Sequence, residues 1–410
     1  MTSESSVMLT VVLAVAVLAP ILADRVSRFV TVPSVVWQIG FGVLIGPAVL
    51  DWVRATGIVD ALSDLGLAFL MLLAGYELEF RLIRGAPLRA AVWAWFASLA
   101  LGVAAGLLIG GSVAAGLVVG LAMTTTTLGA ILPVLRDRGL VRTEFGTRFL
   151  AVGATGEFLP IVAVAFALSG ERPTHMTFVL VLFGVVAAGA AALARRPRHP
   201  AVARLVTVTL GTSAQVAVRF CVLISVAMVA LAESLDLDPV LGAFASGVVI
   251  HLFLDTGVPR ESDEVLKRLE ALGFGFFIPI FFIVSGVRFD VGALSDPATL
   301  ALLPVFLVLF LVVRGAPTTL LQHRALGLRP AVAMGLLAAT ALPLLVVITR
   351  IAQDQGVLSS DLASALVGAG MLSVLIFPAI ALRLLDADLV SSPRDTPARS
   401  PVRPDPRPGP

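Results

Sequence analysis

Long apolar stretches, separated by short polar segments, dominate the chain from its beginning to residue 386. A stretch of about 20 apolar residues forms a helix that crosses the roughly 30 Å hydrocarbon core of a bilayer. Backbone polar groups must be satisfied inside that core, so helices are the elements this pattern predicts. We therefore expect an all-α polytopic membrane protein with thirteen transmembrane helices. They are placed at residues 5–23, 33–51, 60–82, 88–110, 112–135, 146–170, 175–194, 212–234, 237–254, 269–289, 297–321, 329–352 and 359–386.

Composition supports the same class of protein. Hydrophobic residues make up 58% of the 410 positions and charged residues only 14%, whereas soluble domains carry about 25% charged residues. The single cysteine, Cys221, excludes an intramolecular disulfide, and the four histidines are too dispersed for a metal motif. No nucleophile and base occur at a catalytic spacing. We expect no enzymatic activity, no cofactor, no resident metal and no nucleic-acid partner.

Basic residues gather in alternate loops and so predict the orientation. With the N-terminus outside, the inner loops hold 18 arginines and lysines, against Arg54, Arg172 and Arg288 in the outer loops. Arg350 lies near an outer helix end, where its long side chain is expected to reach the interface. Because basic residues favour the cytoplasmic side, this count predicts an N-out, C-in topology. The Pro- and Arg-rich residues 391–410 are expected to form a disordered cytoplasmic tail.

Similar short motifs recur at a nearly constant separation of 205 to 211 residues. Gly42-Val43-Leu44-Ile45 is echoed by Gly247-Val248-Val249-Ile250, and Ala122-Met123 by Ala333-Met334. The separation corresponds to seven predicted helices, an odd number, so the two copies cross the membrane in opposite directions. This predicts inverted five-helix repeats, the organisation of many transporters. Within a transmembrane domain of residues 1–390, the repeats span about 33–170 and 237–386, and connecting helices lie at about 175–234.

Glu157 is the single charge between Arg148 and Glu171, near the middle of a predicted helix. A carboxylate at that depth costs about 2.5–3.5 kcal/mol on insertion scales, so it indicates a functional site. We expect Glu157 to bind the transported ion or proton.

In two other predicted helices, threonine precedes a proline at corresponding places in the repeats. The two prolines are Pro133 and Pro343. Proline removes a backbone donor, and polar neighbours tolerate the resulting break. Ordinary proline kinks are the alternative, but paired breaks in an inverted repeat predict two broken, crossing helices around a midplane site. Hard cations prefer oxygen ligands. The candidate ligands are Thr124, Thr125, Thr126, Thr127, Thr155 and Thr340.

Arg314 is the second deep charge, in the eleventh predicted helix. A guanidinium stays protonated, so at this depth it needs a carboxylate, carbonyl groups or water. Glu157 is the expected charge partner. Extension of Arg314 to an interface is the alternative.

Several motifs resemble one known family in order and spacing. They are Val32–Pro47, Leu73–Leu78, Thr124–Leu135, Pro279–Gly286 and Arg314-Gly315. Together they resemble bacterial monovalent cation:proton antiporters with the sodium/hydrogen exchanger fold, of the second cation–proton antiporter branch. The resemblance implies alternating access in a homodimer, embedded in the lipid of the cell membrane. Family members often carry two adjacent polar residues at the ion site, whereas this chain has Gly156-Glu157.

Secondary exchange of Na⁺ or K⁺ for protons is the function these observations favour, with Glu157 shared by proton and cation. A single carboxylate makes electroneutral, one-for-one exchange the simplest expectation. Two alternatives stay open from the sequence. One is a non-transporting membrane sensor or assembly protein on the same scaffold, and the other is an organic-anion symporter in which Arg314 holds the anion.

Overall fold

The architecture comes from a computed structural model of the 410-residue chain. The structure describes residues 3–27, 34–76, 85–128, 143–168, 216–235, 237–254 and 259–391, with positions 131, 135, 138–141, 181, 184, 185 and 189 between them. Every regular element formed by these residues is helical. The main ones are α1 (Ser3–Ser27), α2 (Ser34–Ile45), α3 (Gly57–Tyr76), α4 (Ala86–Ile109), α5 (Val113–Ala122), α7 (Glu144–Leu168), α10 (Val216–Ser234), α11 (Pro239–Leu254), α12 (Pro259–Leu272), α13 (Ile278–Val287), α14 (Pro297–Phe310), α15 (Ala316–Leu326), α16 (Leu328–Ala338), α17 (Pro343–Asp354) and α18 (Ser360–Ser391).

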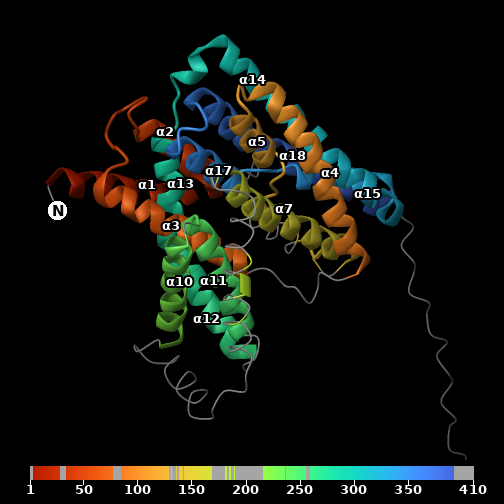
Figure 1. The fold of residues 1–410 in the computed structure, drawn as a ribbon, viewed down its shortest axis with the longest axis horizontal. Coiled ribbons are helices and arrows are strands. Elements are labelled where there is room, and N and C mark those ends of the chain that lie inside the picture. Colours follow the sequence, from red (N-terminus) through yellow and green to blue (C-terminus); the bar gives the residue numbers. More distant parts are fainter. Residues whose placement is uncertain are drawn as a thin grey trace, which may run out of the picture.

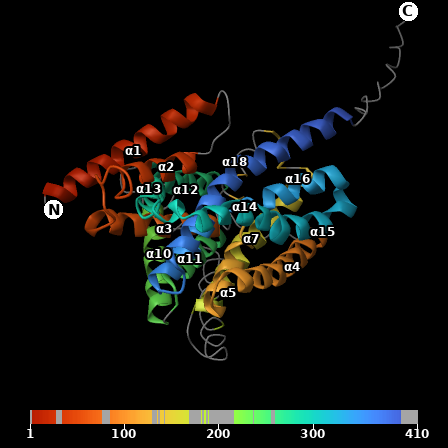
Figure 2. The ribbon, with the colours of Figure 1, turned by 90° about the horizontal axis from the view of Figure 1, so that it is seen from above.

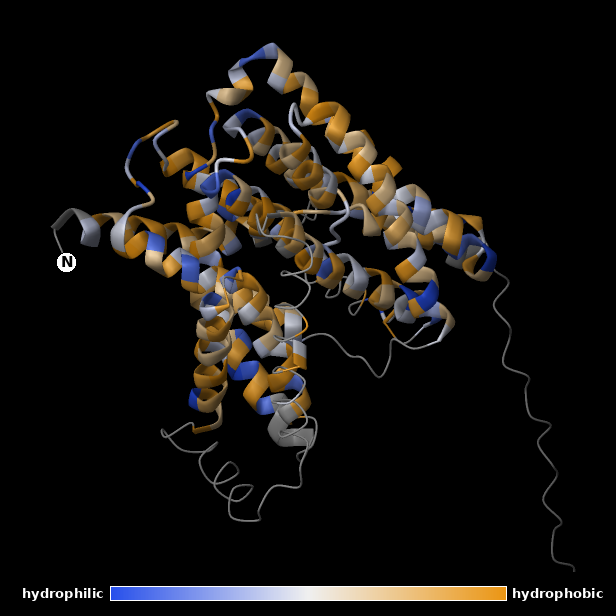
Figure 3. Cartoon of the chain, in the orientation of Figure 1, coloured by the Kyte–Doolittle hydropathy of each residue, from blue (hydrophilic) through white to orange (hydrophobic). Residues whose placement is uncertain are grey.

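Most of the length of these helices is coloured as hydrophobic in Figure 3. Among the described residues, nine helices are long and apolar enough to cross a membrane, and α2, α5 and most of α11 are shorter apolar helices. The all-helical, polytopic prediction is therefore confirmed. The helix predicted at 175–194 lies almost wholly outside the described residues, and so does the predicted tail. The count of thirteen and the orientation stay predictions.

The helices pack in two groups that lie beside one another (Figures 1 and 2). In the first group α3 packs against α11 and α13, while α2 packs on α13 and α10 on α11. In the second, α4 packs against α5, α7 and α15, and α16 packs against α15 and α18. α17 contacts α5, α7 and α18 and lies near the middle of the molecule. The site described below lies where the groups meet.

Glycines lie at the closest helix contacts. This is expected in lipid, where helices associate through close packing of small residues and the hydrophobic effect does not drive them together. Gly42 of α2 and Gly286 of α13 lie at one such contact, and a Cβ atom on either would collide with backbone of the opposite helix. These two positions therefore fix how closely α2 and α13 approach.

Two π-helical turns interrupt otherwise continuous helices. Gly273–Phe277 joins α12 to α13, and Leu311–Gly315 joins α14 to α15. Each turn precedes a proline by two residues, Pro279 or Pro317. Proline has no N–H to donate to the preceding turn, so the backbone there adopts a different hydrogen-bond pattern. The second turn contains Arg314 and sets the direction of its side chain.

Two helices end inside the molecule and resume after a short non-helical segment. The chain is non-helical between Ala122 and Leu128, and again between Ala338 and Pro343. Pro343 begins α17, because the missing N–H of proline is harmless at a helix start. Pro133 lies outside the described residues.

Candidate functional site

The two non-helical segments cross and hydrogen-bond to one another. The Thr127 amide donates to the Thr340 carbonyl at 2.8 Å, and the Leu342 amide donates to Thr127 Oγ1 at 3.0 Å. Thr126 Oγ1 donates to the Ala338 carbonyl at 2.8 Å. Peptide groups released by a helix break need new partners when they are buried. At this crossing each segment supplies partners for the other.

The remaining candidate threonines lie beside the crossing and bond within their own helices. Thr124 and Thr125 donate their hydroxyls to the carbonyls of Leu121 and Ala122, both at 2.8 Å. Thr155 donates to α7 carbonyls at 3.0 Å, and Thr340 to the Leu336 carbonyl at 3.2 Å. Each hydroxyl oxygen keeps lone pairs that could bind a cation. The threonines thus have a structural role at the breaks as well as ligand capacity.

Glu157 projects from α7 towards the first break. Its Oε1 accepts a hydrogen bond from the Leu128 amide at 2.9 Å, and the neighbouring Gly156 carbonyl accepts one from the Thr126 amide at 3.1 Å. A hydrogen bond to an ionised carboxylate is stronger than one between neutral groups. The bond to Leu128 therefore fixes the position of the Glu157 carboxylate beside the first break.

Arg314, from the second π turn, reaches the same segment and is fully buried. Its Nε donates to Thr126 Oγ1 at 2.9 Å and its Nη2 to the Val152 carbonyl at 2.8 Å. The segment from Thr126 to Leu128 thus connects the two deep charges, because Arg314 is hydrogen-bonded to Thr126 and Glu157 to Leu128. A direct charge pair between Glu157 and Arg314 stays a prediction.

Gly156 fills a role that the sequence did not indicate. A Cβ atom at this position would meet Thr126 Oγ1 and lie 2.6 Å from Arg314 Nη2. The guanidinium therefore occupies the space that a side chain at position 156 would need. The only sequence signal was a glycine where resembling proteins often carry a polar residue.

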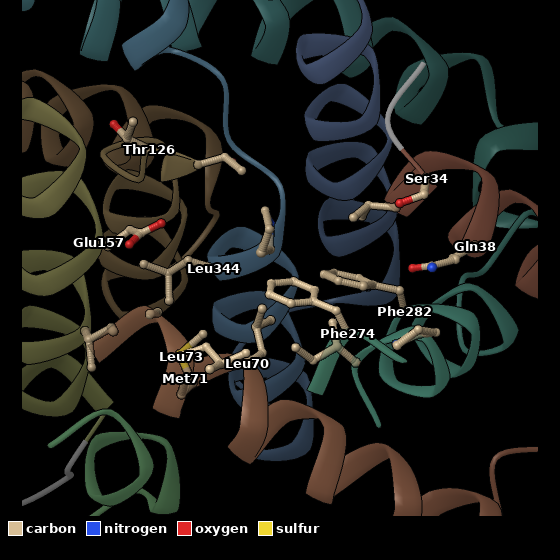
Figure 4. Close-up of a pocket in the computed structure, with 17 residues that line it drawn as sticks. Ser34, Gln38, Leu70, Met71, Leu73, Thr126, Glu157, Phe274, Phe282 and Leu344 are labelled. Atoms are coloured by element: carbon tan, nitrogen blue, oxygen red, sulfur yellow. The ribbon is translucent and has the colours of Figure 1, made fainter. Parts of the chain in front are cut away.

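A cavity of about 320 Å³ adjoins Glu157. Its polar lining comprises Ser34, Gln38, Thr126, Thr127 and Glu157, and apolar residues of α3, α7, α13, α17 and the first π turn complete it. Among the described residues, Glu157 is the only ionisable side chain in this lining, and Arg314 is not part of it. Ser34 and Gln38 lie across the cavity from Glu157 and Thr126 (Figure 4). Gln38 and the aromatic wall at Phe274 and Phe282 were not predicted, because nothing in a single sequence shows which helices face one another.

The chain matches a known family model over nearly all of its predicted membrane region. Residues 13–386 match the model described as "Sodium/hydrogen exchanger, transmembrane". A putative Na⁺/H⁺ antiporter of Bacillus subtilis, YjbQ, is 28% identical over 400 residues, which cover 92% of this chain and 63% of that protein. The Na⁺/H⁺-K⁺ antiporter GerN of Bacillus cereus is 27% identical over 281 residues, covering 67% of this chain and 70% of GerN.

The fold also matches a solved structure. The sodium proton antiporter MjNhaP1 of Methanocaldococcus jannaschii aligns with a TM-score of 0.66, covering 93% of this chain and 99% of that chain at 15% identity. Such low identity shows a shared fold. The relatives named here are transporters and not enzymes, in agreement with the predicted absence of catalytic residues. The family match and the apolar helices together establish that the chain is a multi-pass membrane protein of the sodium/hydrogen exchanger family.

Proposed function

We propose that the chain exchanges a monovalent cation, Na⁺ or K⁺, for protons, with Glu157 binding either ion in turn. The observation that carries this proposal is that, of the residues the structure describes, Glu157 alone is ionisable in the lining of the cavity of about 320 Å³. The names of the relatives, Na⁺/H⁺ and Na⁺/H⁺-K⁺ antiporters, agree with it.

Exchange follows from the cost of an unneutralised carboxylate beside an apolar cavity. Burying an ionised group without compensation is expensive, so Glu157 moves across the membrane more readily with a proton or a cation bound. Because both ions use the same oxygens, they compete, and one enters only when the other has left. The hydroxyl and carbonyl oxygens of Thr126 and Thr127 are the nearest further ligands for a cation.

The proposal includes the remaining expectations from the sequence. The chain would cross the cell membrane thirteen times, N-out and C-in, as inverted repeats in a homodimer. Access to Glu157 would alternate as the broken helices move against the α2, α3, α11 and α13 group. The contacts between the two breaks support their movement as one unit.

An organic-anion symporter has less support. In that function Arg314 would bind the substrate, but Arg314 is fully buried and its hydrogen bonds go to Thr126 and Val152. The part of the lining that the structure describes therefore presents a carboxylate to a ligand and no guanidinium, which favours a cation. The experiment below distinguishes proposed exchange from the other alternative, a non-transporting sensor with the same scaffold.

Substitution of Glu157 by glutamine tests the proposal. Inside-out vesicles carrying the wild type should show proton movement driven by Na⁺ or K⁺ in a dye-quench assay across a pH series spanning neutrality. Glu157→Gln keeps the size of the side chain but cannot ionise, so exchange should fall to the level of empty vesicles.

The matched control is Glu144→Gln on the same helix, where Glu144 is exposed and pairs with Arg148 at 2.9 Å. This variant should retain exchange. Cation-driven proton movement by Glu157→Gln would overturn the role of Glu157. A wild type without any cation-dependent proton movement would favour the sensor.

A further inference from the structure

The pathway from Glu157 is open on one side and nearly closed on the other. The cavity of about 320 Å³ extends from Glu157 to Ser34, at the start of α2. Beyond Ile161 and Leu344, which border this cavity, a second space of about 20 Å³ continues between α7, α11 and α17. A space of that size holds about one water molecule. Val347 and Asp238 lie along this narrow continuation.

Charged residues from three helices meet beyond the closed side. Arg350 of α17 pairs with Asp64 of α3. Its Nη2 atom lies 3.9 Å from Oδ1 of Asp60, and its Nε atom lies 3.7 Å from Oδ2 of Asp354, one turn further along α17. Arg288, directly after α13, also pairs with Asp60. The Arg350 side chain is only 15% exposed. The network therefore ties the far end of α17 to α3 and to the end of α13.

α17 connects this network directly to the ion site. It begins at Pro343, which lines the cavity beside Glu157. Leu342, the residue before it, is hydrogen-bonded to Thr127 at the crossing. Val347 and Arg350 follow on the same helix within two turns. One rigid helix thus joins the crossing, the narrow continuation and the charged network.

We infer that the network of Asp60, Asp64, Arg288, Arg350 and Asp354 is a latch, which holds this side of the Glu157 pathway closed. The latch would regulate access to the proposed ion site. Only its role in transport rests on the proposed function. Opening to this side requires α17 to separate from α3, so the pairs of Arg350 with Asp60 and Asp64 must break. By the distribution of basic residues this is the outer side.

Thiol accessibility tests the latch independently of transport. The reporter is Val347→Cys in a Cys221→Ala background, which removes the chain's own cysteine. A membrane-impermeant methanethiosulfonate is applied to one face of oriented vesicles at a time. Arg350→Gln should raise the labelling rate from the latch side about three- to fivefold, the range expected for partly exposed ion pairs. Labelling from the other face should not change.

Arg54→Gln is the matched control, because Arg54 pairs with Asp51 on an exposed turn at 2.7 Å without contacting the latch. Its labelling rate should equal that of the unmodified reporter. Asp64→Asn, which removes the partner of Arg350 on α3, should act like Arg350→Gln and provides a second test if one variant does not fold. The swap Arg350→Asp with Asp64→Arg should return labelling towards the reporter's rate.

Two outcomes overturn the latch. One is an unchanged labelling rate in folded Arg350→Gln or Asp64→Asn, which would reduce the network to a stabilising contact. The other is an equal rise in Arg54→Gln, which would indicate general loosening. Failure of the proposed function is separate, because faster labelling of the latch variants is measurable even in a chain that moves no protons.

Discussion

At the scale of single residues, Gly156 shows how the site accommodates a buried guanidinium. Arg314 donates to Thr126 and to the Val152 carbonyl across the space that a side chain at 156 would fill. The chain therefore cannot host both Arg314 in this position and a second polar residue before Glu157. Sequence comparison alone presents this glycine as a loss, whereas the geometry presents it as a requirement of packing.

Substitution Gly156→Ala should disturb the site without changing any charge. The added methyl group must displace Arg314 or Thr126, and overpacking of this kind costs about 1–3 kcal/mol. We expect a clear loss of thermal stability and about a fivefold loss of exchange rate, which converts the lower end of that range, about 1 kcal/mol, at about 1.4 kcal/mol per tenfold. Vesicle exchange and thermal unfolding in detergent measure the two effects.

The matched control for this variant is Gly40→Ala in α2, where nothing lies within 4 Å of the added atom. Alanine has the higher helix propensity, so this change should be neutral or slightly stabilising. Equal behaviour of the two variants would contradict the packing role of Gly156.

Asp238, in the turn before α11, gives a pH dependence of stability. Burial raises the pKa of its carboxyl above the ordinary value of 3.8, although its hydrogen bond from the Val240 amide and the charge of Arg350 lower it. A raised folded pKa contributes stability below the ordinary value, and that stability is lost as pH rises through the raised value. Asp238→Asn keeps a helix-capping side chain and removes this loss.

The apparent Tm of Asp238→Asn minus that of the wild type should therefore increase by about 1–2 °C between acidic and neutral pH. Thermal unfolding of both proteins in detergent across a pH series measures the difference. A difference that stays constant with pH would mean that burial of Asp238 has no such effect.

At the scale of elements, the sequence predicted the helices better than their interruptions. Apolar runs and charge placement located the helices because the membrane imposes both their length and their composition. A helix is interrupted between Ala338 and Pro343, in the segment that contains Thr340. The π turn around Arg314 was not predicted, since it depends on how the backbone ahead of Pro317 is accommodated. The contact of Arg350 with Asp64 was also missed, because it joins residues 286 positions apart.

Thr126 should be the most sensitive threonine at the crossing. Its hydroxyl donates to the Ala338 carbonyl and accepts from Arg314 Nε, so Thr126→Val leaves two buried groups unsatisfied. An unsatisfied buried group costs about 1–3 kcal/mol. We expect Thr126→Val to lose most exchange activity and thermal stability, and Thr126→Ser to retain both. Vesicle exchange with unfolding measurements tests this, and equal activity of the two variants would contradict it.

At the scale of the whole molecule, the sequence cannot state which side of the pathway is open. In the proposed alternating cycle the same residues form both conformations, so hydrophobic patterns predict the helices and leave the conformation undetermined. The structure has a cavity of about 320 Å³ on one side of Glu157 and a space of about 20 Å³ on the other. That asymmetry identifies a single conformation of the proposed cycle.

The position of α17 gives this conformation a mechanical consequence. Arg350 lies seven residues beyond Pro343, which at 1.5 Å per residue is roughly 10 Å along the helix axis. A tilt of α17 by about 15° about Pro343 would therefore displace Arg350 by roughly 3 Å, as much as the length of a hydrogen bond. A tilt that moves the start of α17 beside Glu157 by well under an ångström would thus be large enough at the far end of the helix to break an ion pair.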